Sequence, residues 1–257
     1  MRCAHPGFQI DSARDRETRN SKTRYPQAMI QLHRRFSILC FAALAICFAG
    51  QAWGATRAGT ERGASEESGA VLSFRKVFKS STPEFTEIRI RQSGACTYEL
   101  RSLADEADPQ PLEVSTTLRE KMFALAAELQ NFRGADLDIK RRIANLGEKT
   151  FRYERGSETH EVQFNYTVNT AANQLLHIFE GLARQQDLMN TLTRRMKYDR
   201  LGVNDALTQL DTDFKRRLLP EPEALLPMLE RIANDTRFVD IARQRARALV
   251  EAIRHPK

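Results

Sequence analysis

Three side chains beyond the first quarter of the chain have the chemical types that nucleophilic or acid–base catalysis uses. Cys96 is the only cysteine after residue 54, and His160 and His177 are the histidines between residues 60 and 250. A catalytic thiol needs a base within hydrogen-bond reach and an electropositive setting that lowers its pKa. Cys96 shares its expected strand face with Tyr98 and Leu100, a pattern that favours a small apolar core residue. We therefore predict no catalytic residue, and a Cys96–His160 pair is the candidate alternative.

The sequence lacks the patterns typical of metal, nucleotide and serine-hydrolase sites. It contains no HExxH, no CxxC, no glycine-rich phosphate loop and no Gly-x-Ser-x-Gly turn. The acidic pair Asp105 and Asp108 lacks the spacing, the glycine and the closing glutamate of a calcium-binding EF-hand loop. We therefore predict that the protein uses no metal and no cofactor.

The first 54 residues have the features of a secretory signal. Residues 36–50 are uncharged and are apolar apart from one serine. Arg34 and Arg35 precede this run, and Ala52-Trp53-Gly54 follows it with small residues two positions apart. A basic region, a short apolar run and a small-x-small site together predict a signal peptide, here cleaved between Gly54 and Ala55.

Two alternatives for this leader stay open. The 28 residues before Met29 make its basic region unusually long, so translation that starts at Met29 is one alternative. An uncleaved signal anchor is the other, although an apolar run of about 15 to 19 residues is short against the roughly 20 that span a bilayer. Arg34 and Arg35 would then keep the N-terminus cytoplasmic. In each case we expect the C-terminal domain outside the cytoplasm, as a periplasmic, secreted or inner-membrane-anchored protein.

Charge and cysteine content narrow the class of protein further. The 257 residues carry a formal net charge of +7, and eight basic against three acidic side chains lie in the first 35. Because the basic excess is concentrated in the leader, we predict no nucleic-acid binding. A mature chain with Cys96 alone forms no intramolecular disulfide, so its core must stabilise it. Arginine greatly outnumbers lysine, which favours a bacterial source with GC-rich DNA.

Alternating apolar residues predict strands behind a flexible tether at residues 55–70. Three strands occupy 71–79, 84–92 and 95–102, and residues 105–111 form the loop that follows them. A second hairpin turns at Arg155-Gly156, and its alternating residues are Phe151, Tyr153, Val162, Phe164 and Tyr166. Because the strands come in hairpins, we expect an antiparallel sheet.

Helical periodicity occupies most of the remaining sequence. One helix, with Thr117 and Glu120 in capping-box spacing, follows the first three strands, and a long helix capped by Thr170 follows the second hairpin. We predict an α+β fold with an antiparallel sheet of about five strands, in the order three strands, helix, two strands and long helix. The α+β domain is expected at 71–200, and a C-terminal all-helical extension at 201–257.

Basic clusters and strand aromatics each have a structural and a functional interpretation. The clusters at 140–142, 194–195 and 215–217 lie among acidic residues, which favours solvated helix faces. A patch for anionic lipid or cell-wall polymer is the alternative. Core packing is likewise favoured over ligand stacking for the aromatic residues in the strands. These are Phe74, Phe78, Phe85, Tyr98, Phe151, Tyr153, Phe164 and Tyr166.

Together these patterns favour an exported bacterial protein that acts as a non-catalytic envelope or extracellular interaction module. Its expected partner is another envelope protein, bound through a sheet edge or the terminal helices. We expect contact with the membrane only through the N-terminal apolar segment, if that segment is not cleaved. A hydrolase or transferase with an unrecognised site and a single-pass membrane-anchored structural protein are the alternatives.

Overall fold

The computed structural model describes residues 69–139 and 141–256, which belong to one compact unit of the chain. The predicted leader, its cleavage site at Gly54 and Ala55, and the tether up to residue 68 lie outside the described residues. Lys140 of the first basic cluster also lies outside them. The expectations about export therefore stay predictions.

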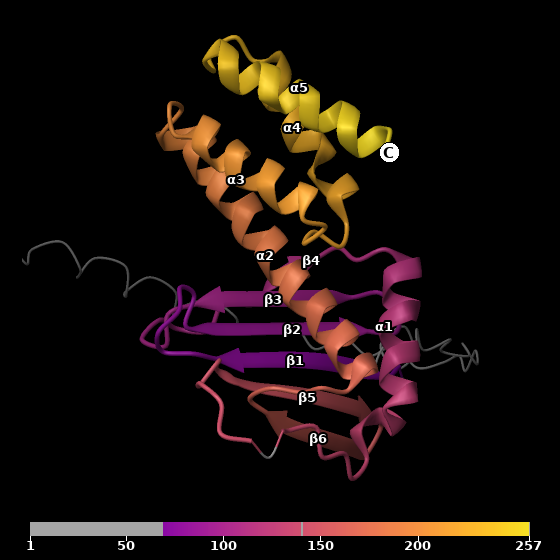
Figure 1. The fold of residues 1–257 in the computed structure, drawn as a ribbon. Coiled ribbons are helices and arrows are strands. Elements are labelled where there is room, and N and C mark those ends of the chain that lie inside the picture. Colours follow the sequence, from indigo (N-terminus) through magenta and orange to yellow (C-terminus); the bar gives the residue numbers. More distant parts are fainter. Residues whose placement is uncertain (1–68, 140, 257) are drawn as a thin grey trace, which may run out of the picture. The chain divides into compact units, whose positions relative to one another are not determined.

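Six antiparallel strands form one sheet in the order β4-β3-β2-β1-β5-β6 (Figure 1). The central strand β1 pairs with β2 on one side and with β5 on the other, so that Phe74 pairs with Ile88 and with Phe151. The strands are β1 (Val71–Val77), β2 (Phe85–Arg91), β3 (Cys96–Arg101), β4 (Gln110–Leu112), β5 (Glu148–Arg155) and β6 (Glu158–Phe164).

The predicted α+β class and antiparallel sheet are confirmed, but the sheet has six strands where about five are predicted. The additional strand is β4, which overlaps the predicted loop at 105–111 and pairs Leu112 with Cys96. Its three residues are too few to show an alternating pattern in the sequence. Pro111 at its centre has no N–H to donate, which suits a short strand at the edge of a sheet.

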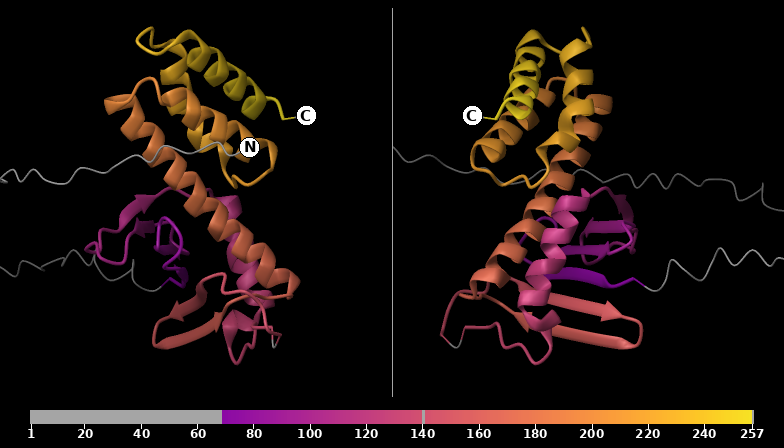
Figure 2. Two further views of the ribbon diagram at one scale, coloured as in Figure 1. Left: turned by 60° about the vertical axis from the view of Figure 1, so that its left-hand side comes forward. Right: turned by 90° about the vertical axis from the view of Figure 1, so that its right-hand side faces the viewer.

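One face of the sheet carries the core, because alternate residues of its strands are apolar and buried. Two helices, α1 (Thr116–Glu128) and α2 (Thr170–Tyr198), lie against this face (Figure 2), and η1 (Gln130–Phe132) packs on β5 and β6. Four buried phenylalanine rings in this core have centroids 5.2 to 5.9 Å apart where they meet, and they are Phe74, Phe132, Phe151 and Phe179.

Five of the eight aromatic residues predicted in strands lie in this core, and Phe78, Phe85 and Tyr166 do not. Phe78 follows the end of β1 and is half-buried. Phe85 alternates onto the opposite face of the sheet, where the guanidinium of Arg101 lies 4.2 Å from its ring centroid. Tyr166 is 42% exposed, because β6 ends at Phe164 and the alternation does not continue beyond the strand.

The helices begin slightly earlier than the capping patterns predict. Ser115, and not Thr117, caps α1, and its hydroxyl accepts the backbone N–H three residues later at 3.2 Å. Asn169, and not Thr170, caps α2, and its side-chain oxygen accepts the N–H three residues later at 3.0 Å. Ser, Thr and Asn all cap helices well.

The predicted C-terminal helical extension is confirmed and has a hydrophobic core of its own. α2 contributes to both cores, since Leu182 packs on the sheet side while Leu188 and Leu192 pack in the extension. No helix in the described part of the chain combines the length and apolar character needed to cross a membrane. The elements of the extension are α3 (Val203–Lys215), η2 (Pro222–Leu225), α4 (Leu226–Asn234) and α5 (Asp240–Arg254).

Candidate functional site

The structure does not bring Cys96 and His160 together. Cys96 begins β3 and His160 lies on β6, and the strands β2, β1 and β5 separate them. Four strand spacings of about 4.8 Å each place the two residues on the order of 19 Å apart, which is too far for proton transfer. Cys96 is buried, and this burial raises the pKa of its thiol. The site therefore favours the unreactive thiol form.

His160 has a local partner instead. Its Nε2 lies 2.9 Å from a carboxylate oxygen of Glu158, two residues earlier on the same strand. The hydrogen bonds from His160 and Arg133 hold the pKa of the Glu158 carboxyl below its usual value. This cluster lies on the edge strand β6 and contains no nucleophile.

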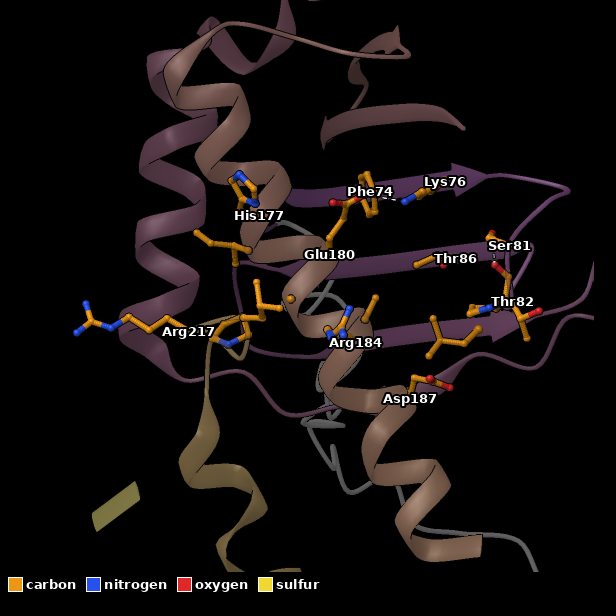
Figure 3. A pocket seen from close by; sticks show the side chains of 17 residues that line it. Phe74, Lys76, Ser81, Thr82, Thr86, His177, Glu180, Arg184, Asp187 and Arg217 are labelled. Atoms are coloured by element: carbon orange, nitrogen blue, oxygen red, sulfur yellow. Dashed lines mark hydrogen bonds and ion pairs between the residues drawn. The ribbon is translucent and has the colours of Figure 1, made fainter. Parts of the chain in front are cut away.

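A cavity of about 530 Å³ lies between α2, the strands β1 to β3 and the chain that follows α3 (Figure 3). Residues at helical spacing along α2 form one of its walls, and we call it the α2 cavity. The α2 side chains include His177, Glu180, Arg184 and Asp187, with Gly181 between them. The facing walls include Phe74, Lys76, Ser81, Thr82, Thr86, Leu100, Arg217, Leu218 and Pro220.

The segment of residues 218–220, which forms one wall of the α2 cavity, lies directly against α2 at Gly181. A Cβ atom at this position would lie 2.7 Å from Cγ of Pro220 and 2.9 Å from the carbonyl oxygen of Leu218. Gln185 fixes the same segment one turn later, because its buried amide donates to the carbonyl oxygen of Glu221 at 2.9 Å. The amide oxygen accepts the Glu221 N–H at 3.2 Å. We call this pair of hydrogen bonds the Gln185 clasp.

Two ion pairs hold charged side chains in place at the α2 cavity. Lys76 of β1 donates to Glu180 of α2 at 2.8 Å. Arg184 binds both carboxylate oxygens of Asp213 on α3, at 2.5 and 2.7 Å. Asp213 is buried and also accepts a hydrogen bond from Gln209 at 3.0 Å. The hydrogen bonds with Asp213 raise the pKa of the Arg184 guanidinium, so this guanidinium stays charged.

Asp187 also lines the α2 cavity but belongs to neither of these ion pairs. Within residues 69–139 and 141–256 it has no ion-pair or hydrogen-bond partner. Asp187 is exposed, but desolvation by the protein around it raises the pKa of its carboxyl, and the nearby charges of Arg194 and Arg184 oppose that shift. His177 lies at the other end of the α2 wall (Figure 3). Ten residues of helix separate the two by roughly 15 Å, too far for an acid–base pair.

The hydroxyl of Ser81, which lines the α2 cavity, forms hydrogen bonds within its own loop. Ser81 Oγ lies 2.8 Å from the carbonyl oxygen of Phe78 and 2.6 Å from that of Pro83. Arg217 points away from the other labelled side chains in Figure 3. Among the described residues, the α2 cavity thus has apolar walls, charged side chains and no nucleophile hydrogen-bonded to a base. Such an arrangement can bind a ligand or a partner segment.

Lys149 is a buried charged residue outside the α2 cavity, and its contacts stabilise the fold. Its ammonium donates to the carbonyl oxygens of Leu146, Gly147 and Asn165 at 3.2, 3.3 and 2.8 Å. Burial lowers the pKa of Lys149, and the nearby charge of Lys76 acts in the same direction. With all three donors of the ammonium used, Lys149 holds the loop before β5 against the end of β6.

The sequence alone does not predict the α2 cavity. The available signal is the spacing of Glu180, Arg184 and Asp187 along one face of a long helix. Charged residues at this spacing are usually interpreted as a solvated face. Their partners come from β1 and α3, and Lys76 lies 104 positions from Glu180. Only the fold brings these residues together.

Known proteins give no guide to this site. No protein-family model matches the chain, and the comparison with curated proteins finds no match. In the described part of the chain, no group of three or more His, Cys, Asp or Glu side chains is placed to hold a metal ion. Function is therefore inferred from the geometry of the chain itself.

Proposed function

We propose that the protein is an exported bacterial envelope protein that acts as a non-catalytic interaction module. Its export is supported by the sequence, with a basic region, the apolar run at 36–50 and a small-x-small site that ends at Gly54. Its role as an interaction module is supported by the α2 cavity, which combines apolar walls with charged side chains.

Within this proposal, the α2 cavity receives a segment of another envelope protein. The observation that carries it is the position of Asp187, which lines the α2 cavity, is exposed and has no ion-pair partner among the described residues, whereas Glu180 and Asp213 are paired. A charged side chain that lines a cavity without a partner in its own chain is available to a ligand. A basic side chain or an N–H group of the partner would complement Asp187. An apolar neighbour of that group would contact Leu100 and Pro220.

Affinity capture from gently cross-linked envelope extract tests the proposal. The tagged chain is compared with Asp187→Asn and with a matched control, Asp205→Asn, which changes an exposed aspartate in the first turn of α3. A hydrogen bond to a charged group contributes about 1.5–3 kcal/mol, so we expect Asp187→Asn to weaken capture roughly tenfold or more. The control is expected to capture the same partner as the unmodified chain.

Two outcomes of this capture contradict the proposal. Equal capture by all three chains excludes Asp187 and the α2 cavity as the binding site. Recovery of the unmodified chain without any reproducible partner contradicts the interaction module and directs attention to small ligands and hydrolase substrates.

Mass spectrometry of the same samples determines the N-terminus and so tests export. A soluble chain that begins at Ala55 supports export with cleavage. Peptides that contain Arg2, recovered in the membrane pellet, support the anchored alternative. A full-length chain found only in the cytoplasm contradicts export.

A further inference from the structure

Two interhelical turns lie at the same end of the helical extension. One joins α2 to α3 and the other joins α4 to α5, and Figures 1 and 2 both place them side by side. The contacts agree, because Arg245 of α5 donates to the side-chain oxygen of Asn204 at 2.7 Å. The charge of Arg200 also acts on Asp235. We call this end the helical tip, which comprises residues 194–204 and 235–245.

The helical tip exposes large apolar side chains. Leu201 is 75% exposed, Tyr198 is 72% exposed and Ile241 is 56% exposed. The first two lie at the turn between α2 and α3, and Ile241 lies in the first turn of α5. Large apolar side chains that gather at one end of a domain are typical of a surface that contacts a membrane or a partner.

Basic side chains accompany these apolar residues. The helical tip contains seven arginine or lysine residues against three aspartates. Two of the aspartates already have partners, since Asp235 lies 2.6 Å from Arg237 and Asp240 lies 2.9 Å from Arg243. Three basic side chains make neither an ion pair nor a hydrogen bond within the part of the chain that the structure describes, and they are Arg194, Lys197 and Arg200.

A cation–π contact joins a basic residue and an exposed aromatic residue of the helical tip. The Nζ atom of Lys197 lies 4.9 Å from the centroid of the Tyr198 ring, so a positive charge and an exposed aromatic ring share one position. At a bilayer interface a tyrosine ring lies at the level of the headgroups, while a lysine keeps its charge near the phosphates.

We propose that the helical tip docks on the surface of an anionic phospholipid bilayer. Its unpaired basic side chains contact the lipid phosphates, and Tyr198, Leu201 and Ile241 enter the headgroup region. Charge complementarity selects this occupant over a second copy of the chain, because two helical tips would bring like charges together. This membrane contact is separate from the N-terminal apolar segment, and of its unpaired basic residues Arg194 alone also acts on the α2 cavity, through the charge of Asp187.

Vesicle flotation of the exported chain, purified from the envelope with its N-terminus determined, tests this proposal. The probes are vesicles of phosphatidylcholine alone and of phosphatidylcholine with roughly 30% phosphatidylglycerol. The tip variant combines Arg194→Gln, Lys197→Gln and Arg200→Gln. The matched control combines Arg141→Gln, Arg142→Gln and Arg155→Gln, which changes three exposed basic residues outside the helical tip and outside the α2 cavity.

We expect the unmodified chain to float with the anionic vesicles and not with the neutral ones. Each basic side chain near such a surface contributes about a fivefold gain in binding, so the tip variant should bind roughly 100-fold more weakly. The control should stay within about fivefold of the unmodified chain, because only long-range attraction is lost. Equal losses in the two variants, or equal binding to both vesicles, would overturn the proposal.

A second readout reports on insertion. Trp53 is the only tryptophan, so a chain cleaved after Gly54 that carries Leu201→Trp has a single tryptophan, in the helical tip, whose emission can be excited selectively. We expect its emission to shift to shorter wavelength with the anionic vesicles. An unchanged emission while the protein floats would place the apolar residues outside the headgroup region and overturn their assigned role. Circular dichroism checks that each variant is folded.

Discussion

Replacing Gln185 by leucine tests whether the Gln185 clasp holds the wall of the α2 cavity. Gln185 is 1% exposed, and its amide makes both of its hydrogen bonds with the backbone of Glu221. Leucine occupies a similar volume but can neither donate nor accept a hydrogen bond. The Glu221 N–H would then lose its protein partner in a half-buried position, while the Glu221 carbonyl oxygen would keep only the hydrogen bond from the Ala224 N–H at 3.2 Å.

The expected magnitude follows from these two groups. A buried polar group left without a partner costs about 1–3 kcal/mol, and partial access to water favours the lower half of that range. The unpartnered Glu221 N–H then costs about 1–2 kcal/mol and the hydrogen bond lost at the carbonyl oxygen costs about 0.5–1.5 kcal/mol, so the free energy of unfolding falls by about 1.5–3.5 kcal/mol. For a domain of this size each kcal/mol corresponds to about 2–4 °C in Tm, so Gln185→Leu should lower Tm by roughly 3–14 °C.

Thermal unfolding followed by circular dichroism measures this change, and Gln174→Leu is the matched control. Gln174 is an exposed residue of the same type on the same helix, and such substitutions usually change stability by no more than about 0.5 kcal/mol. Hydrogen exchange at Leu219 and Glu221 should become faster in Gln185→Leu and stay unchanged in the control. If the two variants melt together and exchange alike, the Gln185 clasp does not hold this wall.

Three further predictions concern the same region and the core. Gly181→Ala should lower stability by about 1–2 kcal/mol in urea unfolding, because the contact with Pro220 outweighs the helix propensity of alanine; a more stable variant would contradict the close approach. Cys96 should react slowly with a maleimide in the native protein and completely once unfolded, and rapid stoichiometric labelling of the native protein would revive the enzyme alternative. Asp187→Asn should raise Tm at pH 7, because the raised pKa means that folding disfavours the charged carboxyl. That penalty is present above the folded pKa and is lost as pH falls to the ordinary value near 3.8, so the difference in Tm should close there, and a constant difference would refute this cause.

The fold class could be predicted from the sequence because its strands and helices show their periods clearly. Cys96 and Tyr98 alternate toward the core as the pattern requires, and α2 shows its apolar stripe over most of its length. β4 was missed because its pairing depends on β3 and not on its own three residues. The sequence also did not distinguish Ser115 from Thr117 as the cap of α1, because serine and threonine both cap helices well.

The candidate sites were less predictable than the fold. Arg184 and Asp213 form their pair only because α3 packs against α2. The helical tip likewise depends on two turns that lie about 35 positions apart in the sequence and meet through α5. In the sequence the cluster at 194–195 shows the charge of this tip but not the apolar residues beside it. Spacing along one element is readable from the sequence, whereas proximity between elements is not.

Site-specific photo-crosslinking in intact cells decides whether the α2 cavity is where the partner binds. A photoreactive amino acid replaces Thr82, which is exposed at the edge of the α2 cavity, and in a matched control it replaces Thr159, which is exposed on the opposite face of the sheet. We predict one discrete cross-linked envelope protein from position 82, lost when Asp187→Asn is added, and none from position 159. Identical products from both positions, or none from position 82, would contradict the proposed function.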